Sequence, residues 1–191
     1  LPNAGKSTFI NQVTNTQAKV GDYPFTTLRP QLGVVQHRNR EFVLADIPGL
    51  IEGASDGAGL GTKFLGHVER TAVLIHLIDA TQEDVVGAWA TIRGELEAYG
   101  AGLADKPELL ALNKADALLP EERAQKVAEI EAAAGITPYV ISGVSGEGVR
   151  DILRLAHGKI RAARVIEKAA ALKLGKTLAP TEDDPDKDWA P

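Results

Sequence analysis

Short apolar runs of strand length alternate with segments of helical periodicity along most of the chain. The apolar runs predict strands at residues 33–36, 42–46, 73–79, 109–112 and 139–141. The periodic segments predict helices at residues 5–14, 85–99 and 149–160, with a fourth helix that begins at Pro120. Polar residues 37–40 separate the first two strands and predict a hairpin. Because the later strands alternate with helices, we expect an α/β fold with a doubly wound sheet that is parallel except at the hairpin.

Two stretches depart from this alternation. Residues 49–66 carry glycine at positions 49, 53, 57, 59, 61 and 66, too many for a stable helix interior, and we expect mobility there. Residues 166–174 have helical spacing, and the residues after them are polar, acidic and proline-containing, which is typical of a linker. We therefore expect a folded domain over residues 1–164 and a C-terminal segment, 165–191, that starts as a helix and ends as a flexible acidic tail.

Composition narrows the class of protein further. Hydrophobic residues make up 44% of the 191, which suits one domain with a sizeable core. The net charge is −5 and lies mostly in residues 181–191, so nothing forms a strongly basic face, and we expect no direct DNA binding. Without cysteine the chain has no disulfide or thiolate metal site, and without a long apolar run we expect no membrane insertion. We expect a cytoplasmic monomer.

The clearest chemical motif stands at the start of the chain. The segment NAGKST, residues 3–8, matches the end of the phosphate loop GxxxxGK[ST], whose first glycine would precede Leu1. In such a loop, backbone amides cradle phosphates, the lysine reaches the β and γ phosphates, and the serine hydroxyl binds Mg²⁺. Because this loop normally follows a buried strand, we interpret the chain as a fragment of a larger protein that lacks its central strand.

A second motif follows the predicted hairpin. Asp46 begins a DxxG sequence, where a carboxylate at a strand end can hold Mg²⁺ through water and the Gly49 amide can contact a γ phosphate. Thr26 and Thr27, in the irregular segment before the hairpin, are candidates to complete the Mg²⁺ shell. Together with the phosphate loop, these residues predict a site that binds phosphates and Mg²⁺.

Two later motifs indicate which base is bound. Asn113-Lys114-Ala115-Asp116 is an NKxD sequence, whose aspartate can accept hydrogen bonds from N1 and the 2-amino group of guanine. Adenine lacks both donors, so a site built to pair them would leave its carboxylate unsatisfied with ATP. The backbone that follows the last strand, at Ser142-Gly143, lies where it would contact the guanine oxygen.

The order and spacing of the motifs predict a P-loop NTPase of the small-GTPase type. Individually they have ordinary explanations, since NKxD can cap a helix, DxxG can form a turn, and paired threonines can reflect strand propensity. The nucleotide contacts that we expect are Asn3, Ala4, Gly5, Lys6, Ser7, Thr8, Phe25, Thr26, Thr27, Asp46, Gly49, Asn113, Lys114, Asp116, Ser142, Gly143 and Val144. The metal ligands that we expect are Ser7, Thr27 and Asp46.

The sequence resembles the GTPase domain of the Obg family over roughly residues 1–164. DYPFTTLRPQLGVV, residues 22–35, and DIPGLIEGASDGAGLGTKFLGHVERT, residues 46–71, resemble that family's two switch segments almost throughout. The resemblance implies that Thr27 binds Mg²⁺ alongside Ser7, and that the protein acts in large ribosomal subunit assembly and in growth or stress control. Gly143 departs from the alanine that is common in such GTPases, but we expect a backbone contact to survive.

The set of residues that would catalyse hydrolysis is incomplete. Leu50 stands where many GTPases place a glutamine that orients water, so we expect slow hydrolysis, on the order of 10⁻⁴ to 10⁻² s⁻¹. Catalysis would then depend on positioning by Lys6, Thr27 and Gly49. Asn3 has two interpretations: a turn-forming residue in a tight loop or, by resemblance to GTPases that also lack the glutamine, a ligand of an activating K⁺.

Alternative functions remain open at the level of sequence. The chain could be a binding module that senses GTP, GDP or guanosine tetraphosphate, with hydrolysis incidental, and Leu50 slightly favours this alternative. An ATPase relative with altered base specificity is a weaker alternative. The histidines show no metal pattern, and we expect His76, in an apolar strand, to be buried and hydrogen-bonded. If the central strand is missing, we expect this fragment alone to bind GTP poorly or aggregate.

Overall fold

The structure is a computed structural model that describes residues 3–14, 32–37, 40–46, 71–100 and 102–173. Its elements are α1 (Lys6–Val13), β1 (Leu32–His37), β2 (Arg40–Ala45), β3 (Leu74–Asp79), α3 (Val85–Tyr99), β4 (Glu108–Asn113), the short 3₁₀ helix η1 (Ala115–Ala117), α4 (Pro120–Ala134), β5 (Tyr139–Val140) and α5 (Val149–Lys173). The strands and helices predicted within these ranges are confirmed. The one large change is the length of α5.

Local sequence explains where the middle helices begin and end. The Asp84 side chain caps α3 by accepting a hydrogen bond of 2.7 Å from the Gly87 amide. Pro120 occupies the first turn of α4, and the Glu122 side chain accepts from the Leu119 amide at 2.8 Å. Gly135 then ends α4 in the left-handed conformation, with φ 68°.

The expected parallel sheet and antiparallel hairpin are both present, and they form two separate hydrogen-bonded ladders. β3, β4 and β5 form a parallel sheet in that order, and β1 pairs with β2 in an antiparallel hairpin. No described strand lies between the hairpin and β3 to join the two hydrogen-bond ladders. The hairpin is instead held by packing, because Val35 and Phe42 belong to the same hydrophobic core as Leu77 of β3.

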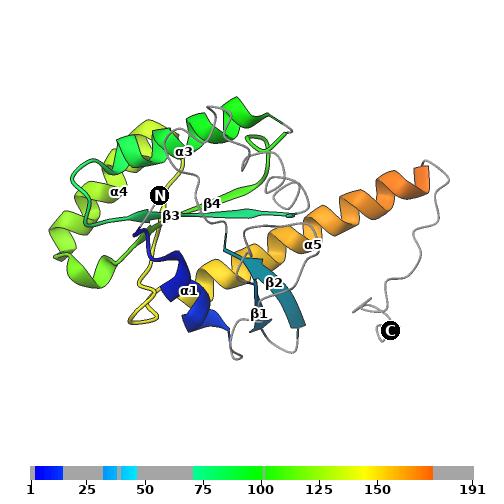
Figure 1. Cartoon of the computed structure of the whole chain (residues 1–191), viewed down its shortest axis with the longest axis horizontal. Helices are drawn as coiled ribbons and strands as arrows, with labels where there is room; N and C mark the ends of the chain where they lie inside the picture. The colour runs from blue at the N-terminus through cyan, green and yellow to red at the C-terminus, as the bar shows by residue number, and fades with distance from the viewer. Residues whose placement is uncertain (1–2, 15–31, 38–39, 47–70, 101, 174–191) are drawn as a thin grey trace, which may run out of the picture.

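Helices cover both faces of the parallel sheet, as a doubly wound fold requires. α3 and α4 lie on one side and α1 and α5 on the other (Figure 1). Successive residues of β4 alternate between the two cores: Leu109 and Ala111 pack toward α5, whereas Leu110 and Leu112 pack toward α3 and α4. The sheet is therefore buried on both faces, which explains why its strands are almost continuously apolar.

α5 is longer than the predicted helix. It continues without a break through residue 164 to Lys173, so the helical spacing at 166–174 belongs to the same element. Its fully buried contacts end at Ala156, while Val165 and Ile166 are 66% and 70% exposed. The domain boundary that we propose at residue 164 therefore marks the end of packing within one helix, not the end of the helix.

The predicted buried histidine, His76, lies in β3 away from the carboxyl ends of the strands. His76 Nδ1 lies 2.7 Å from Glu108 Oε1, and Arg93 binds the other Glu108 oxygen at 3.1 Å. Burial raises the pKa of Glu108, but the hydrogen bonds and charges of His76 and Arg93 outweigh burial and bring this pKa below its ordinary value. The imidazole is thus a satisfied structural group, as predicted.

Within the described ranges, no helix has the length and apolar character needed to cross a bilayer.

Candidate functional site

Buried polar side chains gather at the carboxyl edge of the parallel sheet. Among the described residues, the buried polar or charged side chains are Asp79, Asn113 and Ser142. Asp79 ends β3, Asn113 ends β4, and Ser142 follows β5 closely. In open α/β sheets, ligands bind beyond the carboxyl ends of the strands. The candidate site therefore lies where the predicted motifs are, and these side chains organise it.

Asn113 joins three segments that are distant in sequence. Its side-chain Nδ2 donates to the Ala4 carbonyl at 2.8 Å, and its Oδ1 accepts from the Gly143 amide at 2.9 Å. The side chain is 2% exposed. Through this one amide group, the phosphate loop, the NKxD loop and the loop after β5 are held together.

The phosphate loop leads directly into a helix N-terminus. α1 starts at Lys6, after Gly5 in the left-handed conformation with φ 83°. Gly5 also approaches Asn113 so closely that a Cβ would overlap Nδ2 of that side chain. Phe9 and Ile10 anchor the helix in the core. The first turn thus presents its backbone amides and the positive end of the helix dipole, the usual arrangement for binding phosphate.

Two residues of the predicted motifs have strained backbones. Asn3, with φ 63°, and Lys114, with φ 67°, are the non-glycine residues at positive φ in the described part of the chain. Such conformations persist only where the surroundings enforce them, and they cluster at ligand sites. One residue lies in the phosphate loop and the other in the NKxD loop, so both strained positions belong to the candidate site.

The structure brings together two of the predicted metal ligands. Ser7 Oγ donates to Asp46 Oδ2 at 3.3 Å, although the residues are 39 positions apart. The other carboxylate oxygen, Asp46 Oδ1, is buried without a hydrogen-bond partner. An orphaned carboxylate oxygen beside a hydroxyl offers the hard oxygen ligands that Mg²⁺ prefers. The residues present therefore fit Mg²⁺.

The described residues contain no group of three or more His, Asp or Glu side chains that could hold a metal ion by themselves. In nucleotide sites, Mg²⁺ is bound by one or two protein oxygens together with waters and substrate phosphates. Ser7 and Asp46 would be those protein ligands.

The NKxD loop is fixed from both ends. The Ala115 amide donates to the Ile141 carbonyl at 3.1 Å, and the Ala80 amide donates to the Asn113 carbonyl at 2.9 Å. Lys114 Nζ forms an ion pair with Asp79 Oδ2 at 2.6 Å. Asp116 lies on η1 and is exposed. A rigid loop thus presents a carboxylate at the surface of the site, which suits the recognition of a base.

The loop after β5 is closed by its own hydrogen bonds. Ser142 is buried, and its hydroxyl oxygen accepts from the amides of Ser145 at 2.9 Å and Val144 at 3.3 Å. Gly143 already donates its amide to Asn113. Of the amides of Gly143 and Val144, that of Val144 has the longer internal bond, and the Val144 side chain is exposed.

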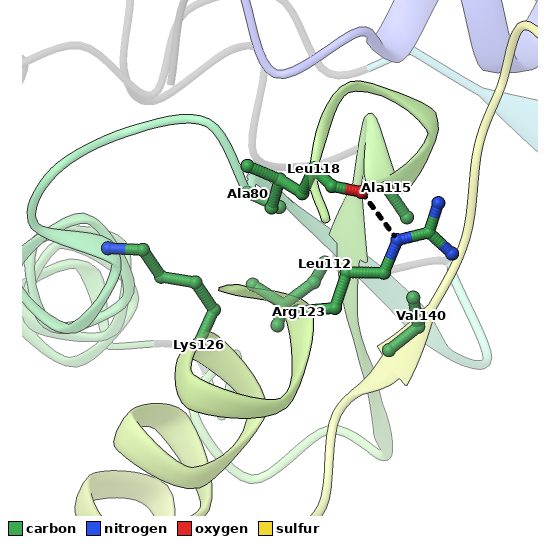
Figure 2. Close-up of a pocket in the computed structure, with 7 residues that line it drawn as sticks. All are labelled: Ala80, Leu112, Ala115, Leu118, Arg123, Lys126 and Val140. Atoms are coloured by element: carbon green, nitrogen blue, oxygen red, sulfur yellow. Dashed lines mark hydrogen bonds between the residues drawn. The ribbon is translucent and has the colours of Figure 1, made fainter. Parts of the chain in front are cut away.

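The NKxD loop and the loop after β5 are together called the base-side loops. Both are contacted by α4. Arg123 Nε donates to the Leu118 carbonyl at 3.2 Å (Figure 2), and its Nη1 lies 3.0 Å from Glu147 Oε1. The small pocket in Figure 2 lies between α4 and the strand ends, and Ala80, Leu112 and Val140 form part of its wall. It lies against the back of the loop that contains Ala115 and Leu118, and we assign no ligand to it.

Several predicted contacts cannot be placed. Phe25, Thr26, Thr27 and Gly49 lie outside the described residues. In the described part of the site, the sequence motifs missed one residue, Asp79. The sequence signal for it was a charge at the end of a largely apolar strand.

The parallel sheet covered on both faces, together with a phosphate loop tied to an NKxD loop, defines a P-loop protein with the GTPase fold. Residues 1–114 match the family described as 50S ribosome-binding GTPase, and the chain belongs to this family. It is thus a GTP-binding GTPase domain.

Solved structures of other proteins share this fold. The nucleolar GTP-binding protein 1 described for Plasmodium falciparum shares 19% identity and a TM-score of 0.57, covering 91% of this chain and 89% of that one. The G domain of the T. maritima FeoB iron transporter shares 22% identity and a TM-score of 0.60, over 85% and 93% of the two chains. A GDP-bound mutant of S. thermophilus NFeoB shares 21% identity and a TM-score of 0.62, over 82% and 57%. At these identities the likeness establishes the fold.

Proposed function

We propose that this domain is a guanine-nucleotide switch that binds GTP with Mg²⁺ and hydrolyses it slowly to GDP. The observation that carries the proposal is the Asn113 junction, in which one buried amide binds both the Ala4 carbonyl and the Gly143 amide. This junction fixes a phosphate-binding loop at a set position relative to the loop that would read the base. Because the two loops are held at a fixed separation, such a site would bind the base and the phosphates of one nucleotide together.

Asp116 is the residue that we propose reads guanine. Its carboxylate would accept hydrogen bonds from N1 and the 2-amino group, and the Gly143 and Val144 amides would lie near the guanine oxygen. Lys114 and Asn113 would position the loop, while the backbone of residues 3–8, together with the Lys6 ammonium, would hold the phosphates. Phe25 and Thr26 would flank the nucleotide from the segment before the hairpin.

Asp116→Asn is expected to reverse the base preference of the chain. The amide oxygen can still accept from N1, but the amide nitrogen presents a donor where guanine has its 2-amino group, whereas xanthine offers a carbonyl oxygen at that position. We expect affinity for GDP to fall by about 100-fold, with affinity for xanthosine diphosphate rising. Competition against a fluorescent GDP analogue measures both. Glu121→Gln on the exposed start of α4 is the control, and GDP selectivity retained in Asp116→Asn would contradict the assignment.

Mg²⁺ would be held by Ser7 and Asp46, with Thr27 completing the shell when a γ phosphate is bound. When present, the ion would neutralise the phosphate charge that develops during transfer. Lys6, Thr27 and the Gly49 amide would position the γ phosphate, and Leu50 leaves no side chain to orient water. Asn3, held at positive φ in the phosphate loop, is the residue that we propose as a K⁺ ligand.

Asp46→Ala is expected to abolish Mg²⁺-dependent hydrolysis, because it removes the buried carboxylate oxygen that lacks a protein partner. Single-turnover hydrolysis of GTP, with Mg²⁺ or with EDTA, measures this. We expect a loss of at least about 100-fold, with GDP binding in EDTA nearly unchanged. The exposed Asp151→Asn serves as the control. Equal hydrolysis by Asp46→Ala and the unsubstituted chain would contradict the metal assignment.

The partner that we propose is the large ribosomal subunit, as for an Obg-type switch in its assembly. Support comes from the description of the matching family and from the resemblance of residues 22–35 and 46–71 to Obg switch segments. The alternative is a guanine-nucleotide or alarmone sensor in which hydrolysis is incidental. The same single-turnover assay separates them: acceleration by added large subunits or by K⁺ supports the switch, and hydrolysis unaffected by either supports the sensor.

A further inference from the structure

Asp79 is a buried charge that none of the sequence motifs includes. It lies at the last position of β3 and is 5% exposed. Burial raises the pKa of this carboxyl, but hydrogen bonds from Lys114 and Thr81 outweigh burial and bring the pKa below its ordinary value. Asp79 is therefore ionised at neutral pH. A buried charge is costly unless it is paired, so its partners indicate what it does.

The two oxygens of the carboxylate have different partners. Oδ1 accepts from the Thr81 amide at 3.0 Å and from the Thr81 hydroxyl at 2.6 Å. Oδ2 accepts from Lys114 Nζ at 2.6 Å. One oxygen thus fixes the carboxylate to the turn after its own strand, which leaves the other oxygen to fix Lys114. The group forms a rigid bridge between the end of β3 and the NKxD loop.

Lys114 is a residue that needs such support. Its backbone is left-handed, with φ 67° and ψ 31°, and it lies directly before η1, which carries Asp116. A lysine gains nothing from this conformation locally, so tertiary contacts must hold it there. The β3–β4 register places Asp79 opposite Asn113, one residue away from Lys114. The bridge is therefore short and acts directly on the strained position.

We propose that Asp79 is a positioning residue of the base-reading loop, which holds Lys114 so that Asp116 is already placed when a nucleotide arrives. This inference rests on the function proposed above. The proposed role of the Asp79–Lys114 pair differs from that of a purely structural ion pair. A structural pair stabilises the fold equally with and without nucleotide. A positioning pair lowers the cost of binding, because the loop does not have to be ordered at that moment.

Asp79→Asn tests the role of the charge, because it keeps the shape of the side chain and can keep the Thr81 contacts. We expect the dissociation constant for a fluorescent GDP analogue to rise about tenfold, as for a charge-assisted hydrogen bond partly open to solvent. The matched control is Asp151→Asn, which removes an exposed carboxylate 3.4 Å from Arg154, and we expect no change. Equal affinities for all three chains, with Asp79→Asn less heat-stable, would reduce Asp79 to a structural role and overturn the proposal.

A double-mutant cycle shows whether Asp79 acts through Lys114. We expect Lys114→Met to weaken GDP binding, and Asp79→Asn to weaken it no further when the lysine is already absent. Additive losses in the double mutant would show that Asp79 acts by another route.

Amide hydrogen exchange of the nucleotide-free chain provides a readout that does not depend on binding. Asp79→Asn is expected to accelerate exchange at Ala115, Ala117 and Leu118, whose amides are bonded within or next to the loop, while amides in α4 stay unchanged. If Asp79→Asn does not fold, Lys114→Met breaks the same pair from its more exposed side. Unchanged exchange in the loop would overturn the role of Asp79. If the unsubstituted chain shows a cooperative thermal unfolding transition and yet binds no guanine nucleotide, the proposed function is contradicted instead.

Discussion

Asn113→Ala is expected to weaken guanine-nucleotide binding by about 100-fold and to lower the free energy of unfolding by about 2–4 kcal/mol. The substitution leaves the Ala4 carbonyl and the Gly143 amide without their partner in a site where water is largely excluded. Each unsatisfied buried group costs about 1–3 kcal/mol. Loss of the junction also frees the phosphate loop from the base-side loops, so the nucleotide must order them on binding.

Isothermal titration with GDP and urea unfolding measure the two effects of Asn113→Ala. The control is Asn11→Ala, which makes the same change at an exposed position of α1, and we expect a stability change within about 0.5 kcal/mol. If Asn113→Ala binds GDP as tightly as the unsubstituted chain, the junction does not organise the site.

Gly5→Ala is expected to destabilise the chain by about 2–4 kcal/mol and to abolish measurable nucleotide binding. The added Cβ meets two obstacles at once. The backbone is left-handed at φ 83°, which costs about 1–2 kcal/mol for alanine. The new carbon also overlaps Nδ2 of Asn113, which would have to release the Ala4 carbonyl.

The matched control for Gly5→Ala is Gly94→Ala, which is expected to change the stability of the chain in the opposite direction. Gly94 lies inside α3 with open space around its missing Cβ, so Gly94→Ala should stabilise the chain by about 0.5–1 kcal/mol through helix propensity. Thermal unfolding and GDP titration of both variants provide the comparison. A Gly5→Ala chain as stable as Gly94→Ala would show that the phosphate loop tolerates a side chain, contrary to the geometry described here.

The sequence predicted the elements well because each carries its own periodicity. Leu109 to Leu112 could be assigned as a fully buried strand from their unbroken apolar character, and α5 from the spacing of Val149, Ile152 and Ala156. The candidate site was predictable where motifs carry their chemistry locally, as in NKxD. The contact between Ser7 and Asp46 was expected from their shared chemistry, although 39 residues separate them.

Other features depend on tertiary placement and had no signal in the sequence. Asp79 becomes part of the site only because the strand register sets β3 beside β4, so no spacing along the chain indicates its ion pair with Lys114. The engagement of the Gly143 amide by Asn113 likewise depends on how two loops meet.

The single helix from Val149 to Lys173 extends well beyond the part of it that is packed in the core. The helix starts within three residues of Gly146, whose amide donates to the Ser142 carbonyl in the base-side loop. With 25 residues, it is about 37 Å long, and its C-terminal end extends away from the sheet and the other helices (Figure 1). Because α5 is packed into the core as far as Ala156, about 25 Å of it lies beyond the packed part, and a bend of about 10° there would move its last turn by about 4 Å. Any change in direction at the end of the packed part would therefore be largest at Lys173.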